Sequence, residues 1–179
     1  IPDMHLPMAG TYNLQNALAA IAAGLEVRAE PEQIRAALSG FSGVKRRFSH
    51  VGKVCDVDIF DDYAHPPGEI AAVLSSAREA AGGLVIGVMQ PHRYTRLRDL
   101  FSDFCSCMNA ADAVFVLPVF TAGEEPIEGF DADQLVEGLR AHGHRHAEAL
   151  AEDDALAPAL AQIIGAGDIV VCMGAGSIT

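Results

Sequence analysis

The sequence lacks tryptophan, a membrane span and an export signal. None of its 179 residues is Trp. No run of about 18 uncharged apolar residues is long enough to cross a bilayer. No charged segment followed by an apolar one opens the chain, so we expect no secretion signal. Half of the residues are apolar, which excludes a disordered chain. The length predicts one folded domain, or one domain with an appendage.

Cysteine is scarce as well, and its spacing indicates no metal site. The four cysteines form no C-x-x-C pair and no set of zinc ligands. No spacing of His, Cys and Asp predicts a metal held by protein side chains alone. We therefore expect reduced thiols, a cytoplasmic location and no metal site within this chain.

Cations are few, and they are unevenly distributed. Lys and Arg number 12 against 24 Asp and Glu, and the resulting charge of −12 argues against a nucleic-acid or anionic-membrane partner. Half of the cations lie in two short runs, at 45–47 and 93–98, and none lies between Phe101 and Leu139. Such runs are often solvated surface, but in an acidic chain they also fit two anion-binding places, and both interpretations stay open here.

Apolar spacing alternates between helical and strand patterns. Helices are predicted from Leu14 to a closure near Gly24, from Pro31 to near Gly40, and at 70–81, 97–108, 132–141 and 154–164. Strands are predicted at 46–53, 54–61, 84–89, 113–119, 147–150 and 168–173. Strands separated by helices are typical of an α/β fold, here a mostly parallel six-stranded sheet with helices on both faces.

The two ends of the chain do not follow this alternation. Residues 1–43 are helical and have no strand to cover, so we expect them to be two helices of a neighbouring domain. The final segment, 174–179, resembles a strand-to-helix loop without its helix. The sequence therefore predicts a piece of a longer enzyme, in which 44–179 form a domain that lacks its last helix.

Polar residues follow three of the predicted strands, where ligands bind in an open parallel sheet. Residues 60–69 place two carboxylates, a phenol and an imidazole there, although an Asp in a loop is often only a turn or cap residue. Next to His92, Arg93 and Arg96 stand three apart at a helix start, where they can form a fork for a carboxylate or phosphate. Gly-Ala-Gly at 174–176 fits either a phosphate loop or a structural turn.

Two common catalytic motifs are absent. The chain has no G-x-x-x-x-G-K-[ST] phosphate loop and no G-x-S-x-G nucleophile elbow. If ATP is a substrate, most of its binding energy must therefore come from outside this chain.

Five segments together resemble the Mur ligases of peptidoglycan synthesis. They are G-T-Y-N-L-Q-N-A-L-A-A at 10–20, G-V-K-R-R-F at 43–48, D-D-Y-A-H-P-P at 61–67, Q-P-H-R-Y-T-R at 90–96 and G-A-G at 174–176. They occur in the order of the family and cover nearly the whole chain. The resemblance implies a Rossmann-like domain and an ATP-dependent enzyme of three domains, which bind UDP, ATP and the amino acid in turn.

Within the family, the third and fourth segments look most like members that join L-alanine to UDP-N-acetylmuramate through an acyl phosphate. Residues 1–43 would then end the central ATP-binding domain, and 44–179 would be the C-terminal domain. Mg²⁺ would accompany ATP, with ligands mostly outside this chain, so we expect the chain alone to fold but not to catalyse. A muropeptide-recycling ligase and a non-catalytic anion-binding module are the alternatives.

The resemblance also implies roles for particular residues. Asn13 and Asn16 would contact the adenine side of ATP, Arg47 would reach the γ-phosphate, and Asp62 would hold the ribose. The residues implied to line the amino-acid pocket are Tyr63, His65, His92, Arg93 and Arg96. Of these, His65 and His92 could position the amine or accept its proton, and together with Arg47 they are the expected catalytic residues.

Three positions depart from the family pattern. Tyr12 and Pro66 stand where the family has His, and Gly68 stands where it has Thr. We assign these three residues no role.

Overall fold

The computed structural model describes residues 4–8 and 10–178, which form two compact units. The first unit is Ile1–Lys45 and the second is Arg46–Thr179. This division lies two residues beyond the boundary predicted after residue 43. Each unit is described by itself below. No helix of the described residues is long and apolar enough to cross a membrane.

The first unit is a pair of helices, α1 (Thr11–Glu26) and α2 (Pro31–Ser39). Pro31 opens α2, where its missing N–H costs nothing, and the side chain of Gln33 accepts from the Glu30 N–H at 3.0 Å. The predicted closure of α1 near Gly24 is wrong by two residues. A Cβ atom at Gly24 would lie 3.1 Å from the side chain of Ile34, so this glycine allows the two helices to approach rather than ending the first.

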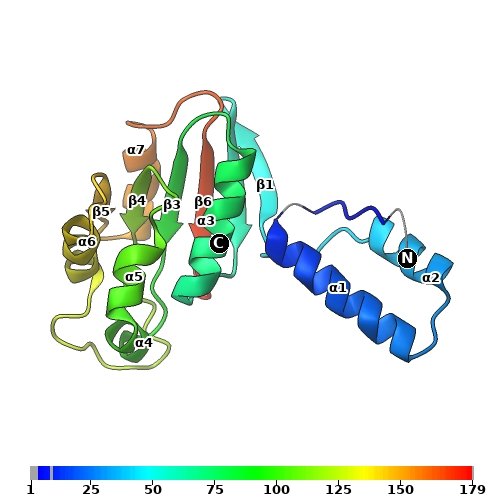
Figure 1. Cartoon of the computed structure of the whole chain (residues 1–179). Coiled ribbons are helices and arrows are strands. Elements are labelled where there is room, and N and C mark those ends of the chain that lie inside the picture. The colour runs from blue at the N-terminus through cyan, green and yellow to red at the C-terminus, as the bar shows by residue number, and fades with distance from the viewer. Residues whose placement is uncertain (1–3, 9, 179) are drawn as a thin grey trace. The chain divides into compact units, whose positions relative to one another are not determined.

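The second unit is built on the predicted six-stranded, mostly parallel sheet (Figure 1). Its strands are β1 (Ser49–Val54), β2 (Val57–Asp62), β3 (Val85–Met89), β4 (Ala113–Val116), β5 (Ala147–Ala149) and β6 (Ile169–Met173). Their order across the sheet is β1-β2-β6-β3-β4-β5. Only β1 is antiparallel, in a hairpin with β2. The last strand in the chain therefore lies in the middle of the sheet.

The first strand starts later than predicted. The prediction began it at Arg46, but Arg46 and Phe48 have φ of 59° and 47°, in the left-handed region, and β1 begins only at Ser49. Backbone of this kind leaves the extended conformation, because a side chain at positive φ is tolerated only in turns and bends. The chain therefore bends sharply as it enters the sheet.

The helices of the second unit are α3 (Pro67–Ala80), α4 (Tyr94–Asp99), α5 (Phe101–Cys107), α6 (Ala132–Ala141) and α7 (Leu156–Leu160). Two predictions about them are wrong. The single helix expected at 97–108 is two helices, because the backbone breaks at Leu100 (φ −117°, ψ 21°). The helix expected at 154–164 is a 3₁₀ turn, Asp153–Ala155, followed by the short α7. The helix at 132–141 has the predicted ends, and Asp131 caps it by accepting from the Gln134 N–H at 2.9 Å.

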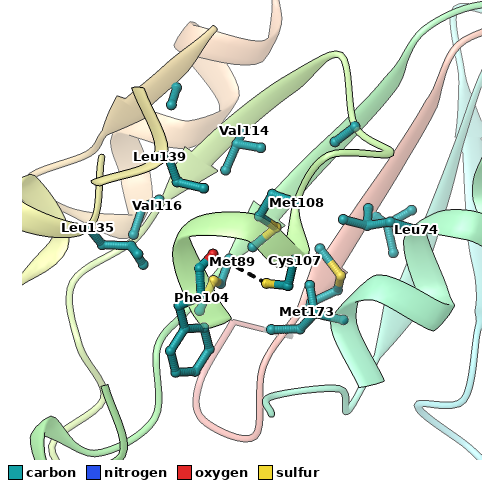
Figure 2. Packing of buried hydrophobic residues seen from close by; sticks show 14 of the residues in the cluster. Leu74, Met89, Phe104, Cys107, Met108, Val114, Val116, Leu135, Leu139 and Met173 are labelled. Atoms are coloured by element: carbon teal, nitrogen blue, oxygen red, sulfur yellow. Dashed lines mark hydrogen bonds between the residues drawn. The ribbon is translucent and has the colours of Figure 1, made fainter. Parts of the chain in front are cut away.

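Apolar side chains fill both faces of the sheet. On one face, α3, α5 and α6 cover the larger cluster, which includes Leu74, Phe104, Met108, Leu135 and Met173 (Figure 2). On the other face, α7 packs against a smaller cluster that includes Ile86, Val88, Phe115, Leu117 and Val170. Neighbouring residues of β3 alternate between the two clusters, as the period of a strand requires. Helices on both faces are thus confirmed.

Candidate functional site

The parallel strands end at one level, so the loops that follow them meet. In the sheet register Met173 of β6 lies between Asp62 of β2 and Met89 of β3, and Met89 is also opposite Val116 of β4. Each of these four residues is the last of its strand. The segments that begin at 63, 90, 117 and 174 therefore leave the same edge of the sheet, which is where an open parallel sheet binds ligands.

A hollow of about 620 Å³ opens at this edge. Its lining residues are Tyr63, His65, His92, Arg93, Thr95, Arg96, Asp99, Leu100 and Ala175. All five residues that were expected to line an amino-acid pocket are among them. The structure brings these five side chains together, and their role in binding an amino acid stays a prediction.

Four rings follow one another along the hollow. The ring of Tyr63 meets that of His65 edge-on at 5.3 Å between centroids, and His65 is 5.6 Å from His92. The His92 ring stacks on Phe120 at 5.3 Å. Phe120 comes from the loop after β4 and is tied to this row by its backbone, because its carbonyl accepts from the Arg93 N–H at 2.9 Å.

The two histidines make different hydrogen bonds. Nδ1 of His65 lies 3.0 Å from the carbonyl oxygen of Tyr63. Nδ1 of His92 lies 3.2 Å from Nη1 of Arg96, which also donates to the His92 carbonyl at 3.2 Å. Burial lowers the pKa of His92, the positive charges of Arg96 and Arg93 lower it further, and the charge of Glu124 opposes the decrease. Burial and the two arginines thus favour the neutral imidazole of His92.

The two arginines of the predicted fork are anchored separately. Arg96 is held on His92, whereas Nη1 of Arg93 lies 3.8 Å from the carboxylate of Glu124. That carboxylate also accepts from the backbone N–H of Thr95 at 3.0 Å and from its hydroxyl at 2.7 Å, bonds that lower the pKa of Glu124. Both arginines line the hollow, so a carboxylate bound there can meet both, but the structure does not orient them as a parallel fork.

Behind the hollow, Arg46 links strand β2 with two of the converging segments. Its guanidinium donates to the Gly174 carbonyl, lies 3.5 Å from a carboxylate oxygen of Asp61, and stands 5.0 Å from the centre of the Tyr63 ring. The Arg46 carbonyl also accepts from the Tyr63 N–H at 2.8 Å. No role was predicted for Arg46 from its sequence pattern, although it stands next to Arg47 in the same basic run.

Asp62, expected to hold the ribose of ATP, is buried in the structure, and that role stays a prediction. The residue has no exposed surface, and its two carboxylate oxygens accept from the N–H groups of Phe48 at 2.6 Å and Ala64 at 2.7 Å. Burial raises the pKa of Asp62, while these two N–H groups and the charge of Arg47 oppose the increase. Asp62 thus ties the segment before β1 to the loop after β2 through both of its carboxylate oxygens.

Arg47, Asn13 and Asn16 lie outside the hollow. Arg47 is 46 % exposed in its side chain, and its Nη1 lies 3.9 Å from a carboxylate oxygen of Glu69. Asn13 is buried and Asn16 is exposed, both on α1 of the first unit. Their expected contacts with ATP stay predictions.

Of the two interpretations of the Gly174-Ala175-Gly176 loop, the structure favours the turn. A Cβ atom at Gly176 would come within 2.4 Å of Oε1 of Gln90 and 2.6 Å of the Phe120 ring, so close packing demands glycine. Gln90 itself is buried, and its N–H donates to the Met173 carbonyl at 3.0 Å. The glycines therefore let this loop pack against the loops after β3 and β4.

The departures at Pro66 and Gly68 leave the next helix intact. Pro66 is the cap of α3, and its carbonyl accepts from the N–H groups of Glu69 and Ile70 at 3.1 Å each.

Two residues missed by the sequence analysis, Phe120 and Glu124, both follow β4 in the chain. Their only sequence signal is that they come after the carboxyl end of a strand.

A family model, described as the Mur ligase glutamate ligase domain, matches residues 46–176. The chain belongs to the Mur ligase family. Its first matched residue is also the first residue of the second structural unit. The fold of that unit, an α/β Rossmann-like sheet, is the fold of a Mur ligase domain.

Two curated relatives of this Mur ligase chain share one name. The UDP-N-acetylmuramate–L-alanine ligases of Acidiphilium cryptum and Paramagnetospirillum magneticum are 57 % and 54 % identical to it over 179 residues. These matches cover all of this chain and 37 % and 38 % of the relatives. The chain thus spans less than two-fifths of the length of the curated relatives it matches.

Solved structures agree at the level of the fold. A UDP-N-acetylmuramate-alanine ligase from Thermotoga maritima matches 98 % of this Mur ligase chain with a TM-score of 0.78 and 26 % identity, and the match covers 37 % of that protein. A murein peptide ligase from Psychrobacter arcticus matches 97 % of it with a TM-score of 0.69, also at 26 % identity, over 36 % of that protein.

Proposed function

We propose that this chain is the C-terminal part of a UDP-N-acetylmuramate–L-alanine ligase, and that its second unit binds the amino acid. The observation that carries the proposal is the hollow that holds two arginines and two histidines beside one another. The identity of 53–57 % to ligases of this name supports the choice of substrate. UDP-N-acetylmuramate and ATP would bind mainly to parts of the enzyme that this chain does not contain.

The reaction of such a ligase has two chemical steps. The muramyl carboxylate attacks the γ-phosphate of ATP and gives an acyl phosphate and ADP. The amine of L-alanine then attacks the acyl carbon, and phosphate leaves. In the second step the enzyme must hold a zwitterion, neutralise its carboxylate and aim a neutral amine at the acyl carbon.

The hollow supplies groups for each of these tasks. Arg93 has half of its side chain exposed and is loosely paired with Glu124, so it can turn to a substrate carboxylate. Arg96 lies beside it and is held by His92. The imidazoles of His65 and His92 lie along the same wall, within reach of an amine that is anchored by its carboxylate.

The first step would draw on the residues outside the hollow. Arg47 is exposed and is held only by a long contact with Glu69, so it is free to approach a γ-phosphate when domains close. Asn13 and Asn16 would face the adenine. Mg²⁺ normally accompanies ATP, but the described residues contain no group of three or more His, Cys, Asp or Glu that could hold it.

The muropeptide-recycling ligase is the second candidate within the family. The murein peptide ligase noted above shares the fold at a lower TM-score than the alanine ligase. The two candidates differ in the nucleophile, because the recycling ligase would use a tripeptide, which is far larger than L-alanine. A non-catalytic module is disfavoured by membership of a ligase family.

The test is made in the full-length enzyme, by replacing Arg93 or Arg96 with Gln. Each change should raise the KM for L-alanine by at least tenfold, because truncating a charge contact of this kind costs about 2–5 kcal/mol, and should leave the KM for ATP nearly unchanged. Arg98→Gln is the matched control, because Arg98 lies on the same helix as Arg96 and pairs with Asp99 but does not itself line the hollow. A normal KM for L-alanine with a weakened KM for ATP would instead make the hollow a phosphate site. Turnover with a tripeptide and none with L-alanine would favour the recycling ligase.

A further inference from the structure

The two histidines of the hollow contact groups of opposite hydrogen-bonding character. The partner of His65 Nδ1 is the carbonyl oxygen of Tyr63, which only accepts. The partner of His92 Nδ1 is the guanidinium of Arg96, which only donates. In a neutral imidazole one ring nitrogen carries the proton and the other a lone pair. Each contact therefore fixes a tautomer.

The tautomers are opposite. His65 carries its proton on Nδ1 and presents a lone pair at Nε2. His92 has its lone pair on Nδ1, against Arg96, and presents an N–H at Nε2. Because both rings line the hollow, with centroids 5.6 Å apart, the site offers one accepting and one donating ring nitrogen.

The surroundings of His92 hold it in this state. A protonated His92 would direct an N–H toward the N–H of Arg96, and their bond would be lost. The guanidinium does not yield easily, because its second bond, to the His92 carbonyl, keeps it in place. The lowered pKa of this imidazole follows from the same contacts and from burial. His92 is thus poorly suited to take up a proton.

We propose that Nε2 of His65 accepts a proton from the ammonium group of the amino-acid substrate, while Nε2–H of His92 donates a hydrogen bond to the substrate carboxylate. The inference rests on the proposed function. It assigns one role to each histidine, where the sequence left positioning of the amine and acceptance of its proton open to both. His65 is then the catalytic residue of the pair, and His92 is a binding residue.

The proton balance of the step is complete. The ammonium gives one proton to His65 and becomes a neutral amine. Its lone pair forms the C–N bond to the acyl carbon as the C–O bond to phosphate breaks. The second amine proton leaves with the phosphate, and the protonated His65 returns its proton to solvent.

In a pH profile, the titration of His65 must be distinguished from that of the other titratable or charged groups of the hollow. These groups are Tyr63, His92, Arg93, Arg96 and Asp99. Histidine is the only one of these side-chain types that ordinarily titrates between about pH 5 and 8. Comparing variants of the two histidines therefore separates the group that accepts the proton from its surroundings.

The first experiment reads the tautomers directly in this chain, by side-chain nitrogen NMR of its histidines at neutral pH. We expect the Nδ1–H form for His65 and the Nε2–H form for His92. Arg96→Met is the control, which should change the pattern of His92 and leave that of His65. The same tautomer in both rings, or the reverse assignment, would overturn the proposal, and this measurement needs no substrate.

The second experiment measures L-alanine-dependent turnover of the full-length enzyme against pH. His65→Gln should lower turnover by about 10²–10⁴ at neutral pH, the usual contribution of proton transfer, and the loss should shrink as rising pH deprotonates the amine. His92→Gln keeps an N–H donor and should lose about tenfold or less, with the pH profile unchanged. Trapping of the acyl phosphate with hydroxylamine should be normal in both, because its formation needs no amine.

The outcomes separate this inference from the proposed function. If the unaltered enzyme makes no L-alanine-dependent product, the proposed function fails, and the NMR measurement still decides the tautomers. If that product forms and His65→Gln has normal turnover, or if raised pH rescues His92→Gln rather than His65→Gln, the inference alone fails. Thermal unfolding of each variant shows whether a loss of turnover reflects a loss of fold.

Discussion

The residues that line the hollow and the residues behind it come from the same sequence segments, yet they differ in almost every physical respect. The lining set is Tyr63, His65, His92, Arg93 and Arg96, all at least partly exposed. The backing set is Arg46, Asp62, Gln90 and Gly176, which bond or pack against neighbouring loops. A segment of the sequence therefore mixes groups that meet a ligand with groups that hold its loop.

Adjacent residues show the difference most clearly. Arg46 is bound to the loops after β2 and β6, whereas Arg47 has nearly half of its side chain in solvent. Asp62 is fully buried under its own loop, whereas Tyr63 beside it lines the hollow. Substitutions in the lining set should thus change the kinetics of the enzyme, and substitutions in the backing set should change the stability of this chain.

The largest expected effect is that of Arg47→Ala on turnover. In the full-length enzyme it should reduce turnover by about 10³-fold or more, the value of an arginine that neutralises a transferring phosphoryl group. The melting temperature of this chain should hardly change, since exposed substitutions cost under about 0.5 kcal/mol. The measurement is phosphate release beside thermal unfolding. A large loss of stability with nearly normal turnover would place Arg47 in the backing set.

Asp62→Ala should be the mirror image, with its main effect on stability. It leaves the N–H groups of Phe48 and Ala64 buried without an acceptor, at a cost of about 2–4 kcal/mol in the free energy of unfolding. Asp62→Asn keeps one acceptor oxygen and should lose about half as much. Urea unfolding of this chain measures both. If Asp62→Ala unfolds like the unaltered chain while ATP binding to the full-length enzyme collapses, the ribose role predicted for Asp62 would be favoured over a structural one.

Gly176→Ala tests the backing set by adding only a methyl group, with no change in charge or hydrogen bonding. The new methyl group would overlap Gln90 and Phe120, and overpacking of this kind costs about 1–3 kcal/mol. Ala175→Gly is the control at the neighbouring position, where no contact of this kind is lost. Loss of anion binding without loss of stability in Gly176→Ala would instead revive the phosphate-loop interpretation.

Much of this arrangement could be predicted from the sequence, because it depends on local patterns. Apolar periodicity gave all six strands and the ends of α6, where Asp131 is a readable cap. The rule that polar residues after parallel strands converge gave the lining set. Such features need only the neighbours of a residue in the chain.

What could not be predicted depends on distant partners. Whether Asp61 or Asp62 turns inward is decided by the N–H of Phe48, fourteen positions away, and by the left-handed backbone that presents it. Phe120 and Glu124 reach the hollow through a loop with no helical or strand period. The break at Leu100 is invisible too, since apolar spacing continues across it from Leu97 to Phe104.

The smallest expected effect concerns a histidine far from the hollow, His144, which is buried and whose Nε2 lies 3.1 Å from the Ala111 carbonyl. Burial lowers the pKa of His144, and its bonds to backbone carbonyls oppose the decrease. The folded chain therefore binds this proton less readily than the unfolded chain, whose histidine titrates near 6.5. The stability contributed by neutral His144 is fully present above that pH and is lost as the pH falls through the lower folded value.

His144→Gln should accordingly flatten the decline in the free energy of unfolding between neutral and mildly acidic pH, measured by urea unfolding at several pH values. His142→Gln, an exposed change two residues away, should leave the slope as it is. A slope unchanged by His144→Gln would contradict this assignment and place the pH dependence of stability in other titratable groups.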